Sequence, residues 1–200
     1  PPAAVASLLN SSTNETPKAG DARLSRARTI VVARPVDSLA AAAALARKDG
    51  VVPIVLGDAL EGEARPCAIL HAENARNAAA DGRATVLLSG GETTVTVHGS
   101  GRGGRNAEFA LALALALDGA PGIHAIACDT DGIDGTEDNA GAYVDPGGLA
   151  RARALGLDPL RLLENNDSYA YFRALGDLIV TGPTRTNVND FRAILIEGDI

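Results

Sequence analysis

Methionine and tryptophan are absent from the 200 residues, lysine occurs only at Lys18 and Lys48, and aromatic residues make up 3%. So few aromatic rings exclude a stacking surface for single-stranded nucleic acid. The formal net charge of -7 argues against nucleic acid or an anionic membrane as a partner. The longest apolar run, Phe109–Leu117, is too short to span a membrane. Without an initiator Met, and with Pro1-Pro2 in place of a signal peptide, we expect a piece of a longer protein.

Cysteine and histidine are also scarce. Cys67 and Cys128 do not form a disulfide framework, and we expect free, buried thiols in a cytoplasmic protein. The three histidines and two cysteines have no spacing typical of a zinc site. The sequence contains neither a Gly-x-Ser-x-Gly nucleophile elbow nor a Walker A motif, which excludes those hydrolases and the P-loop kinases.

Alternating helix and strand patterns indicate an α/β fold. Residues 1–28 are rich in turn formers and are predicted to be an extended arm or linker. Residues 29–200 are predicted to be one α/β domain, with a mixed, mostly parallel sheet and flanking helices. We expect Gly90-Gly91 to form a turn between two antiparallel strands. The predicted strands are 29–33, 51–56, 85–88, 93–98, 123–128, 178–181 and 193–196, and the predicted helices are 39–48, 64–81, 106–117, 149–155 and 169–175, with a loop at 57–62.

Four polar loops follow predicted strands, where ligands of open α/β sheets gather. In the first, the backbone at Gly90 and Gly91 and the side chain of Thr93 are candidates to hold an anion, with Glu92 orienting Arg105 or a hydroxyl group. A plain Gly-Gly hairpin turn is the alternative. The second loop joins glycines and arginines to the start of a helix, which is typical of an anion site. Its candidate residues are Gly101, Gly103, Gly104, Arg105 and Asn106.

The second loop also permits a dinucleotide interpretation. Gly99, Gly101 and Gly104 spell G-x-G-x-x-G, and Asp129 would then be the acidic residue that binds a ribose. Against this, residues 93–98 alternate polar with apolar, whereas the first strand of a dinucleotide fold is continuously apolar. Two arginines also favour direct pairing with a phosphate or carboxylate. A purely structural turn remains open.

The third and fourth loops supply oxygen and amide groups. Asp129, Asp131 and Asp134 in the third loop are candidates for a Mg²⁺ site or a general base, and acidic turn residues bonded to their own backbone are the alternative. The fourth loop, 181–190, contributes the candidates Thr184, Asn187 and Asn189, with a polar surface loop as its alternative.

Together, these loops resemble the MOFRL-type glycerate 2-kinase family, whose members are also named hydroxypyruvate reductases. The similarity rests on Ser89–Val95, Gly101–Asn106 with Glu108-Phe109, Asp129–Gly135 and Thr181–Thr184 with Thr186–Asp190, supported by Glu15–Lys18 and Leu60–Arg65. Ala107 stands where the family usually has Gln. The resemblance covers nearly the whole chain but only the C-terminal half of a family member. The preceding nucleotide-binding domain, with its glycine-rich segment and catalytic lysine, has no counterpart here.

The resemblance implies a kinase that transfers the γ-phosphoryl group of ATP to the 2-hydroxyl of D-glycerate, giving 2-phosphoglycerate, with Mg²⁺. Arg105 would clamp the glycerate carboxylate or the phosphoryl group, and Asn187 and Asn189 would line the cleft. Asp131, with Asp129 beside it, would accept the hydroxyl proton or hold Mg²⁺. An NAD(P)H-dependent hydroxypyruvate reductase is the alternative. We expect a small-molecule substrate and no activity from this chain alone, and homo-oligomer formation stays open.

Overall fold

The computed structural model describes residues 1–11 and 14–198. Its contacts divide the chain into two units, Pro1–Val32 and Ala33–Ile200. The first unit holds helix α1 (Ala3–Leu9) and the 3-10 helix η2 (Ala22–Leu24), and α1 has no buried residue. Residues 12–13 of the predicted arm and 199–200 of the predicted domain lie outside the described residues, and the predicted boundary after residue 28 stays a prediction.

The predicted strand at 29–33 is wrong. All five residues are described, none belongs to a strand, and Ile30, Val31 and Val32 are exposed. A β-branched run favours extended backbone, but it becomes a strand only where a neighbouring strand completes its hydrogen bonds.

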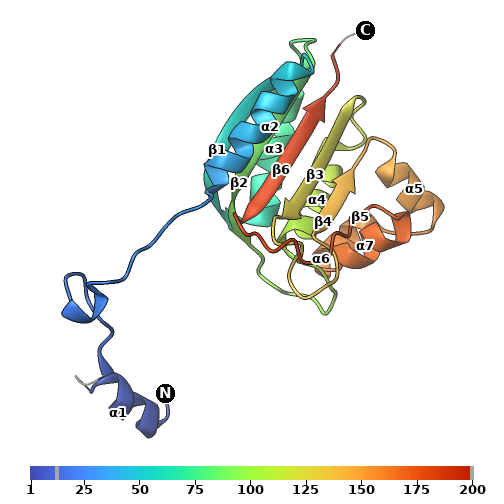
Figure 1. Cartoon of the computed structure of the whole chain (residues 1–200). Helices are drawn as coiled ribbons and strands as arrows, with labels where there is room; N and C mark the ends of the chain where they lie inside the picture. The colour runs from blue at the N-terminus through green and yellow to red at the C-terminus, as the bar shows by residue number, and fades with distance from the viewer. Residues whose placement is uncertain (12–13, 199–200) are drawn as a thin grey trace. The chain divides into compact units, whose positions relative to one another are not determined.

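A mixed sheet forms the second unit, as predicted (Figure 1). Within the described residues it has six strands in the order β1-β2-β6-β3-β4-β5. Only β1 and β2 are parallel, and the other four neighbouring pairs are antiparallel, so the expectation of mostly parallel pairing is wrong. The reason is that β6, between β2 and β3, and β4, between β3 and β5, each run opposite to both of their neighbours. The strands are β1 (Val52–Glu63), β2 (Thr85–Thr94), β3 (Ile123–Asp129), β4 (Gly141–Val144), β5 (Leu178–Ile179) and β6 (Asp190–Ile196).

The Gly90-Gly91 pair lies inside β2 and forms no turn. The two strands expected at 85–88 and 93–98 are one continuous strand, which ends at Thr94. A Cβ at Gly91 would lie 2.2 Å from the backbone N and O of Leu60 in β1. Residues 57–62, predicted as a loop, belong to β1, where its register with β2 shifts. Glycine therefore allows the two strands to approach closely at an irregular part of the sheet.

Helices cover the two faces of the sheet unequally (Figure 1). Helix α2 (Pro35–Lys48) packs on β1 and β2, where Leu39 and Ala43 contact Val86 and Leu88. The opposite face carries α3 (Ala64–Ala79) and α4 (Arg105–Leu117), around which α5 (Gly148–Ala154), α6 (Pro159–Glu164) and α7 (Ser168–Leu175) pack. No helix in the described part of the chain is both long and apolar enough to span a membrane.

The Ala/Leu run forms the central helix α4, as predicted. Its side chains are buried almost all round, with Phe109, Leu111 and Leu113 fully enclosed. Helix α3 faces it with alanines at 64, 68, 72 and 75. Small side chains at this helical spacing let the two helices pack closely. The start of α4 is thereby held at one edge of the sheet.

Three strands meet at that edge. Gly91 in β2 is the register partner of Asp190 in β6, which in turn is the partner of Asp129 in β3. The carboxyl ends of β2 and β3 thus lie beside the first residue of β6. The third predicted loop begins at this row, the fourth ends at it, and the first contains Gly91. Arg105 is the first residue of α4.

Candidate active site

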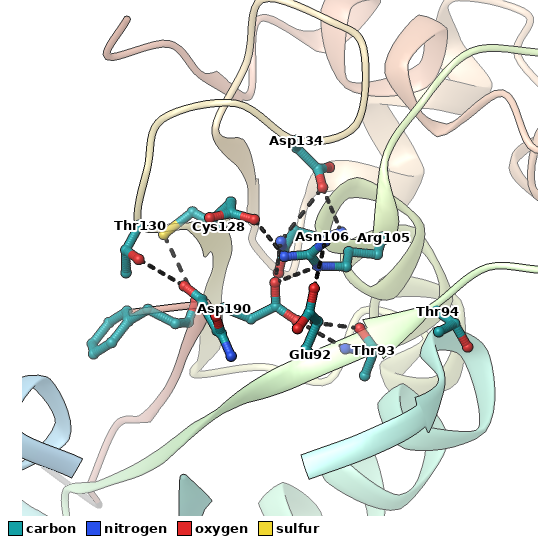
Figure 2. Close-up of polar contacts among 12 residues, drawn as sticks. Glu92, Thr93, Thr94, Arg105, Asn106, Cys128, Thr130, Asp134 and Asp190 are labelled. Atoms are coloured by element: carbon teal, nitrogen blue, oxygen red, sulfur yellow. Dashed lines mark hydrogen bonds and ion pairs between the residues drawn. The ribbon is translucent and has the colours of Figure 1, made fainter. Parts of the chain in front are cut away.

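Arg105 is at the centre of the site (Figure 2). Its Nε donates to Asp190 Oδ1 at 2.7 Å and its Nη2 donates to Asp129 Oδ2 at 2.5 Å. Its Nη1 lies 3.8 Å from Glu92 Oε1, too far for a hydrogen bond. Two carboxylates therefore hold the guanidinium group in place, and Nη1 is the nitrogen left to bind an anion. The predicted group of Glu92, Arg105 and Asp129 is brought together by the fold.

Asp190 is the acceptor that organises this cluster. Its Oδ1 also accepts from Asn106 Nδ2 at 2.9 Å, and its Oδ2 accepts from the backbone N of Thr93 at 3.1 Å and from Arg192 Nη2 at 2.5 Å. Both Asp190 and Arg192 are buried. Sequence analysis placed Asp190 at the end of the fourth motif without a role. The one local signal is that Asp190 is a charged residue shortly before an apolar run. That signal does not reveal its hydrogen bonds to Arg105, Asn106 or Arg192.

Asp129 and Asp131 differ in burial and in how strongly other protein groups already bind their carboxylate oxygens. Asp129 is buried, and burial raises the pKa of its carboxyl, although Arg105 and the backbone N–H of Asp131 favour the ionised form. Asp131 is half-buried; its Oδ1 accepts from the backbone N of Ile133 at 2.9 Å, and Asn187 Nδ2 lies 3.4 Å from its Oδ2. Asp131 is therefore the carboxylate of the loop with the most capacity to bind a substrate or a metal ion.

The structure corrects the prediction for Asp134 as a metal ligand. Its Oδ1 accepts from the backbone N of Asn106 at 2.9 Å, and its Oδ2 accepts from that of Ala107 at 2.8 Å. The side chain is fully buried, and burial raises its pKa to about 6. Asp134 thus caps α4, and the N–H groups of Asn106 and Ala107 are not free for a ligand. Within the described residues, no group of three or more His, Cys, Asp or Glu side chains is arranged to hold a metal ion.

The glycine-rich turn is packed against the segment that joins α6 to α7. The backbone N–H groups of residues 98–102 donate to Asn165, Asn166 and Asp167. A Cβ at Gly99 would lie 2.2 Å from the carbonyl oxygen of Asn165. A Cβ at Gly101, Gly103 or Gly104 would meet Asp167, Ser168 or Asp134 at 2.3–2.4 Å. Close packing within the protein therefore accounts for these glycines, which sequence analysis attributed to a ligand.

The same turn still borders an open cavity of about 770 Å³. Gly101, Gly103 and Gly104 line it together with Glu92, Thr93 and Arg105. Glu108, at its base, is buried and binds Arg65 Nε at 2.7 Å and Asn166 Nδ2 at 3.0 Å. No role was predicted for Glu108, Arg65 or Asn166 from the sequence. The cavity provides room for a small hydroxy acid beside Nη1 of Arg105.

The fourth loop mainly supports the third. Thr184 Oγ1 donates to the carbonyl of Thr130 at 2.5 Å, and the carbonyl of Asn189 accepts from Thr130 Oγ1 at 2.8 Å. Of the three predicted residues of this loop, Asn187 is the one whose side chain donates to the carboxylate of Asp131 in the described part of the chain. Cys128 directly precedes Asp129 in β3, and burial raises the pKa of its thiol to about 11. Both cysteines are free, as predicted.

The MOFRL family model matches residues 85–190, which include β2, α4, β3 and the cluster around Arg105. The chain belongs to the MOFRL family. This confirms the family resemblance that the four loops indicated. The matched range ends at Asp190, so the family model covers the row of strand ends that carries the site.

Known MOFRL relatives include proteins of two different names. A protein of Agrobacterium vitis, provisionally named a hydroxypyruvate reductase, is 55% identical over 189 residues, which are 92% of this chain and 42% of that protein. The D-glycerate 2-kinase of Thermotoga maritima is 50% identical over 104 residues, 52% of this chain and 25% of the kinase. The chain thus spans less than half the length of these relatives.

The MOFRL fold is also present in a solved structure. The crystal structure of glycerate kinase from Thermotoga maritima matches with a TM-score of 0.81 and 37% identity, over 84% of this chain and 42% of that one. This agreement supports the mixed sheet with flanking helices described above.

Proposed function

We propose that this chain forms the substrate side of a glycerate kinase, which transfers the γ-phosphoryl group of ATP to the 2-hydroxyl of D-glycerate and releases 2-phosphoglycerate and ADP. The observation that carries the proposal is Arg105, fixed by Asp190 and Asp129 with Nη1 left for an anion. Asp131, whose carboxylate is half-buried, follows on the same loop, and its backbone N donates to Asp129 Oδ1 at 3.2 Å. The glycerate kinases among the relatives support the substrate.

Phosphoryl transfer requires mainly positioning and neutralisation of charge. Arg105 would bind the glycerate carboxylate or the transferring phosphoryl group through Nη1. The 2-hydroxyl oxygen would form the new bond to phosphorus as the bond to the ADP oxygen breaks, and Asp131 would accept the hydroxyl proton. Asp131 and the side-chain oxygen of Asn187 are also oxygen donors of the kind that Mg²⁺ prefers, and a bound Mg²⁺ would neutralise phosphate charge.

The phosphates of ATP need residues outside this site. The first turn of α4 is already capped by Asp134. Of the two lysines, Lys48 is the last residue of α2, about 20 Å along the helix from Pro35, and the ammonium group of Lys18 pairs with Glu15. We therefore expect no glycerate phosphorylation by residues 1–200 alone. Measurable ADP formation by this chain with D-glycerate and ATP would contradict that expectation.

Variants of the full-length protein test the assignment. Arg105→Ala and Asp131→Asn should each lower kcat/KM for D-glycerate by about 100-fold or more, because each removes a charge placed at the reacting groups. The matched control is Arg102→Ala, which changes an exposed arginine of the same turn that pairs with Glu137. The kcat/KM of this variant should stay within about threefold of that of the parent enzyme. ADP release gives the rate, and ³¹P NMR distinguishes 2-phosphoglycerate from the 3-isomer. Near-normal turnover in Arg105→Ala would rule out this site.

A hydroxypyruvate reductase is the second candidate, since the Agrobacterium vitis relative carries that name. The geometry favours it less: the glycines of the G-x-G-x-x-G turn pack on residues 165–168 and Asp134, and Asp129 binds Arg105 instead of facing a ribose. Two assays separate the candidates. The full-length protein is mixed with hydroxypyruvate and NADH, and separately with D-glycerate and ATP. NADH consumption without ADP formation would reverse the ranking.

A further inference from the structure

We propose that Asp190 and Arg192 are positioning residues for Arg105: Asp190 holds the guanidinium group so that Nη1 alone is offered to an anion, and Arg192 cancels the negative charge of Asp190. The effect on catalysis rests on the proposed function, whereas the effect on the geometry of Arg105 does not.

The hydrogen bonds of Arg105 support the first half of the proposal. A guanidinium group has five N–H donors in a rigid plane, so fixing two nitrogens fixes the third. Asp190 binds Nε and Asp129 binds Nη2. Asp190 is itself held from several sides by Asn106, Thr93 and Arg192. A ligand that approaches Arg105 through the cavity therefore meets a donor whose direction is already set.

The charges support the second half. Asp129 and Asp190 are both buried and both contact Arg105, so these three groups alone sum to one negative charge when ionised. Such a group would repel an incoming carboxylate or phosphate. Arg192 Nη2 lies 2.5 Å from Asp190 Oδ2 and brings the sum to zero. An anion at Nη1 then meets no net charge from these four residues, and the nearest remaining carboxylate at Arg105 in the described residues is the exposed Glu92, whose Oε1 lies 3.8 Å from Nη1.

The burial of Arg192 suggests more than a stabilising role. Its side chain is fully enclosed, lies with Cζ 4.8 Å from the centre of the Phe109 ring, and leaves Nε and Nη1 without a hydrogen-bond partner in the described residues. Buried ion pairs often stabilise a protein no better than well-packed apolar residues. The pair is instead well placed to set the charge and direction of Arg105.

The first test measures the geometry in this chain. The double variant Asp190→Asn/Arg192→Gln removes both charges and keeps polar side chains of equal or smaller size, so neither partner is left as an unpaired buried charge. The Nε–H signal of Arg105 in ¹⁵N NMR, assigned by its loss in Arg105→Lys, should exchange with solvent at least about tenfold faster in the double variant. The control is Asp177→Asn, which breaks a surface ion pair with Arg151. Melting temperature and the backbone amide spectrum report whether each variant is folded.

The second test measures turnover in the full-length protein. The folded double variant should lose about 30-fold or more in kcat/KM for D-glycerate, with KM for ATP unchanged. Arg192→Lys, which keeps the charge, should retain more activity than the double variant, and Arg192→Gln, which leaves Asp190 unbalanced, should retain less. Each rate is divided by the folded fraction of the variant at the assay temperature, because a merely structural role would lower the folded fraction and leave kcat/KM per folded molecule unchanged.

Two outcomes would overturn the proposal: a folded double variant with the parent exchange rate at Arg105 Nε–H, or one with the parent kcat/KM for D-glycerate. If the full-length parent protein shows no kinase activity, the proposed function fails, and the exchange measurement still decides whether Asp190 positions Arg105.

Discussion

At the scale of single residues, the site contains a balanced set of four charges, three of them buried and the fourth, that of Arg105, half-buried. Arg105 and Arg192 face Asp129 and Asp190, and each carboxylate has a cationic partner at 2.5–2.7 Å. Asp134, nearby, has backbone N–H partners instead. Gly104 precedes α4 without a side chain that could cap it, so Asp134, 28 residues away from Asn106, supplies the cap. A loop carboxylate thus secures the helix that carries Arg105.

The raised pKa of Asp134 predicts a dependence of stability on pH. Its folded value of about 6 lies above the ordinary 3.8, so the folded state binds this proton more tightly than the unfolded state. The resulting stability is fully present below pH 3.8 and is lost as the pH rises through 6. Between pH 4 and pH 7, the free energy of unfolding of the parent should therefore fall by roughly 2–3 kcal/mol relative to Asp134→Asn.

Urea unfolding of both proteins at the two pH values measures this difference. The control is Asp118→Asn, an exposed carboxylate at the other end of α4, which should follow the parent. Identical pH dependence in the parent and Asp134→Asn would show that burial does not raise the pKa of Asp134.

At the scale of elements, the glycine of β2 and the glycines of the turn before α4 make room for different neighbours. In β2, Gly91 gives room for the backbone of β1. In the turn before α4, glycines give room for the segment between α6 and α7, whose Asn165 and Asn166 bind the turn's N–H groups. The turn is thereby fixed before any ligand arrives. Sequence analysis missed α6, although Asp158 followed by Pro159 is a good helix start.

Two alanine substitutions test the packing of the turn. Gly99→Ala places a Cβ 2.2 Å from Asn165 O and 2.4 Å from its C, both backbone atoms that cannot move independently. We expect a loss of about 2 kcal/mol or more in the free energy of unfolding, as for overpacked sites. Gly148→Ala, at the start of α5, meets nothing closer than 3.8 Å and should be neutral or slightly stabilising. Chemical denaturation of both variants gives the comparison, and equal stability of the two would contradict it.

At the scale of the whole molecule, the second unit contains both clusters of buried apolar side chains. The larger lies between the sheet and α3, α4 and their neighbours, and the smaller lies under α2. Residues 1–11 and 14–32, the described part of the first unit, belong to neither cluster. Its stability contribution should therefore be small.

Deletion of residues 1–32 tests this division. The shortened chain should keep the free energy of unfolding within about 0.5 kcal/mol of the parent, which is the range of changes away from a core. Urea unfolding followed by circular dichroism is the measurement. A deletion that lowers stability by several times that amount would mean that these residues support the sheet.

The sequence alone determined the α/β class, the helices around 64–79 and 105–117, and the candidates Arg105, Asp129 and Asp131. These features have local signals: a helical period, a run of strong helix formers, or polar residues directly after a buried strand. The order of four motifs also identified the family, since each motif is a short contiguous string.

Only the tertiary structure decided how the site is built. The insertion of β6 between β2 and β3 places Asp190 beside Gly91 and Asp129, although 99 and 61 residues separate it from them along the chain. The tertiary structure also made Asp134 a helix cap and packed the glycines of the turn against Asp134 and the segment 165–168. Strand order and long-range hydrogen bonds depend on which distant surfaces pack together, and no local period or spacing records that choice.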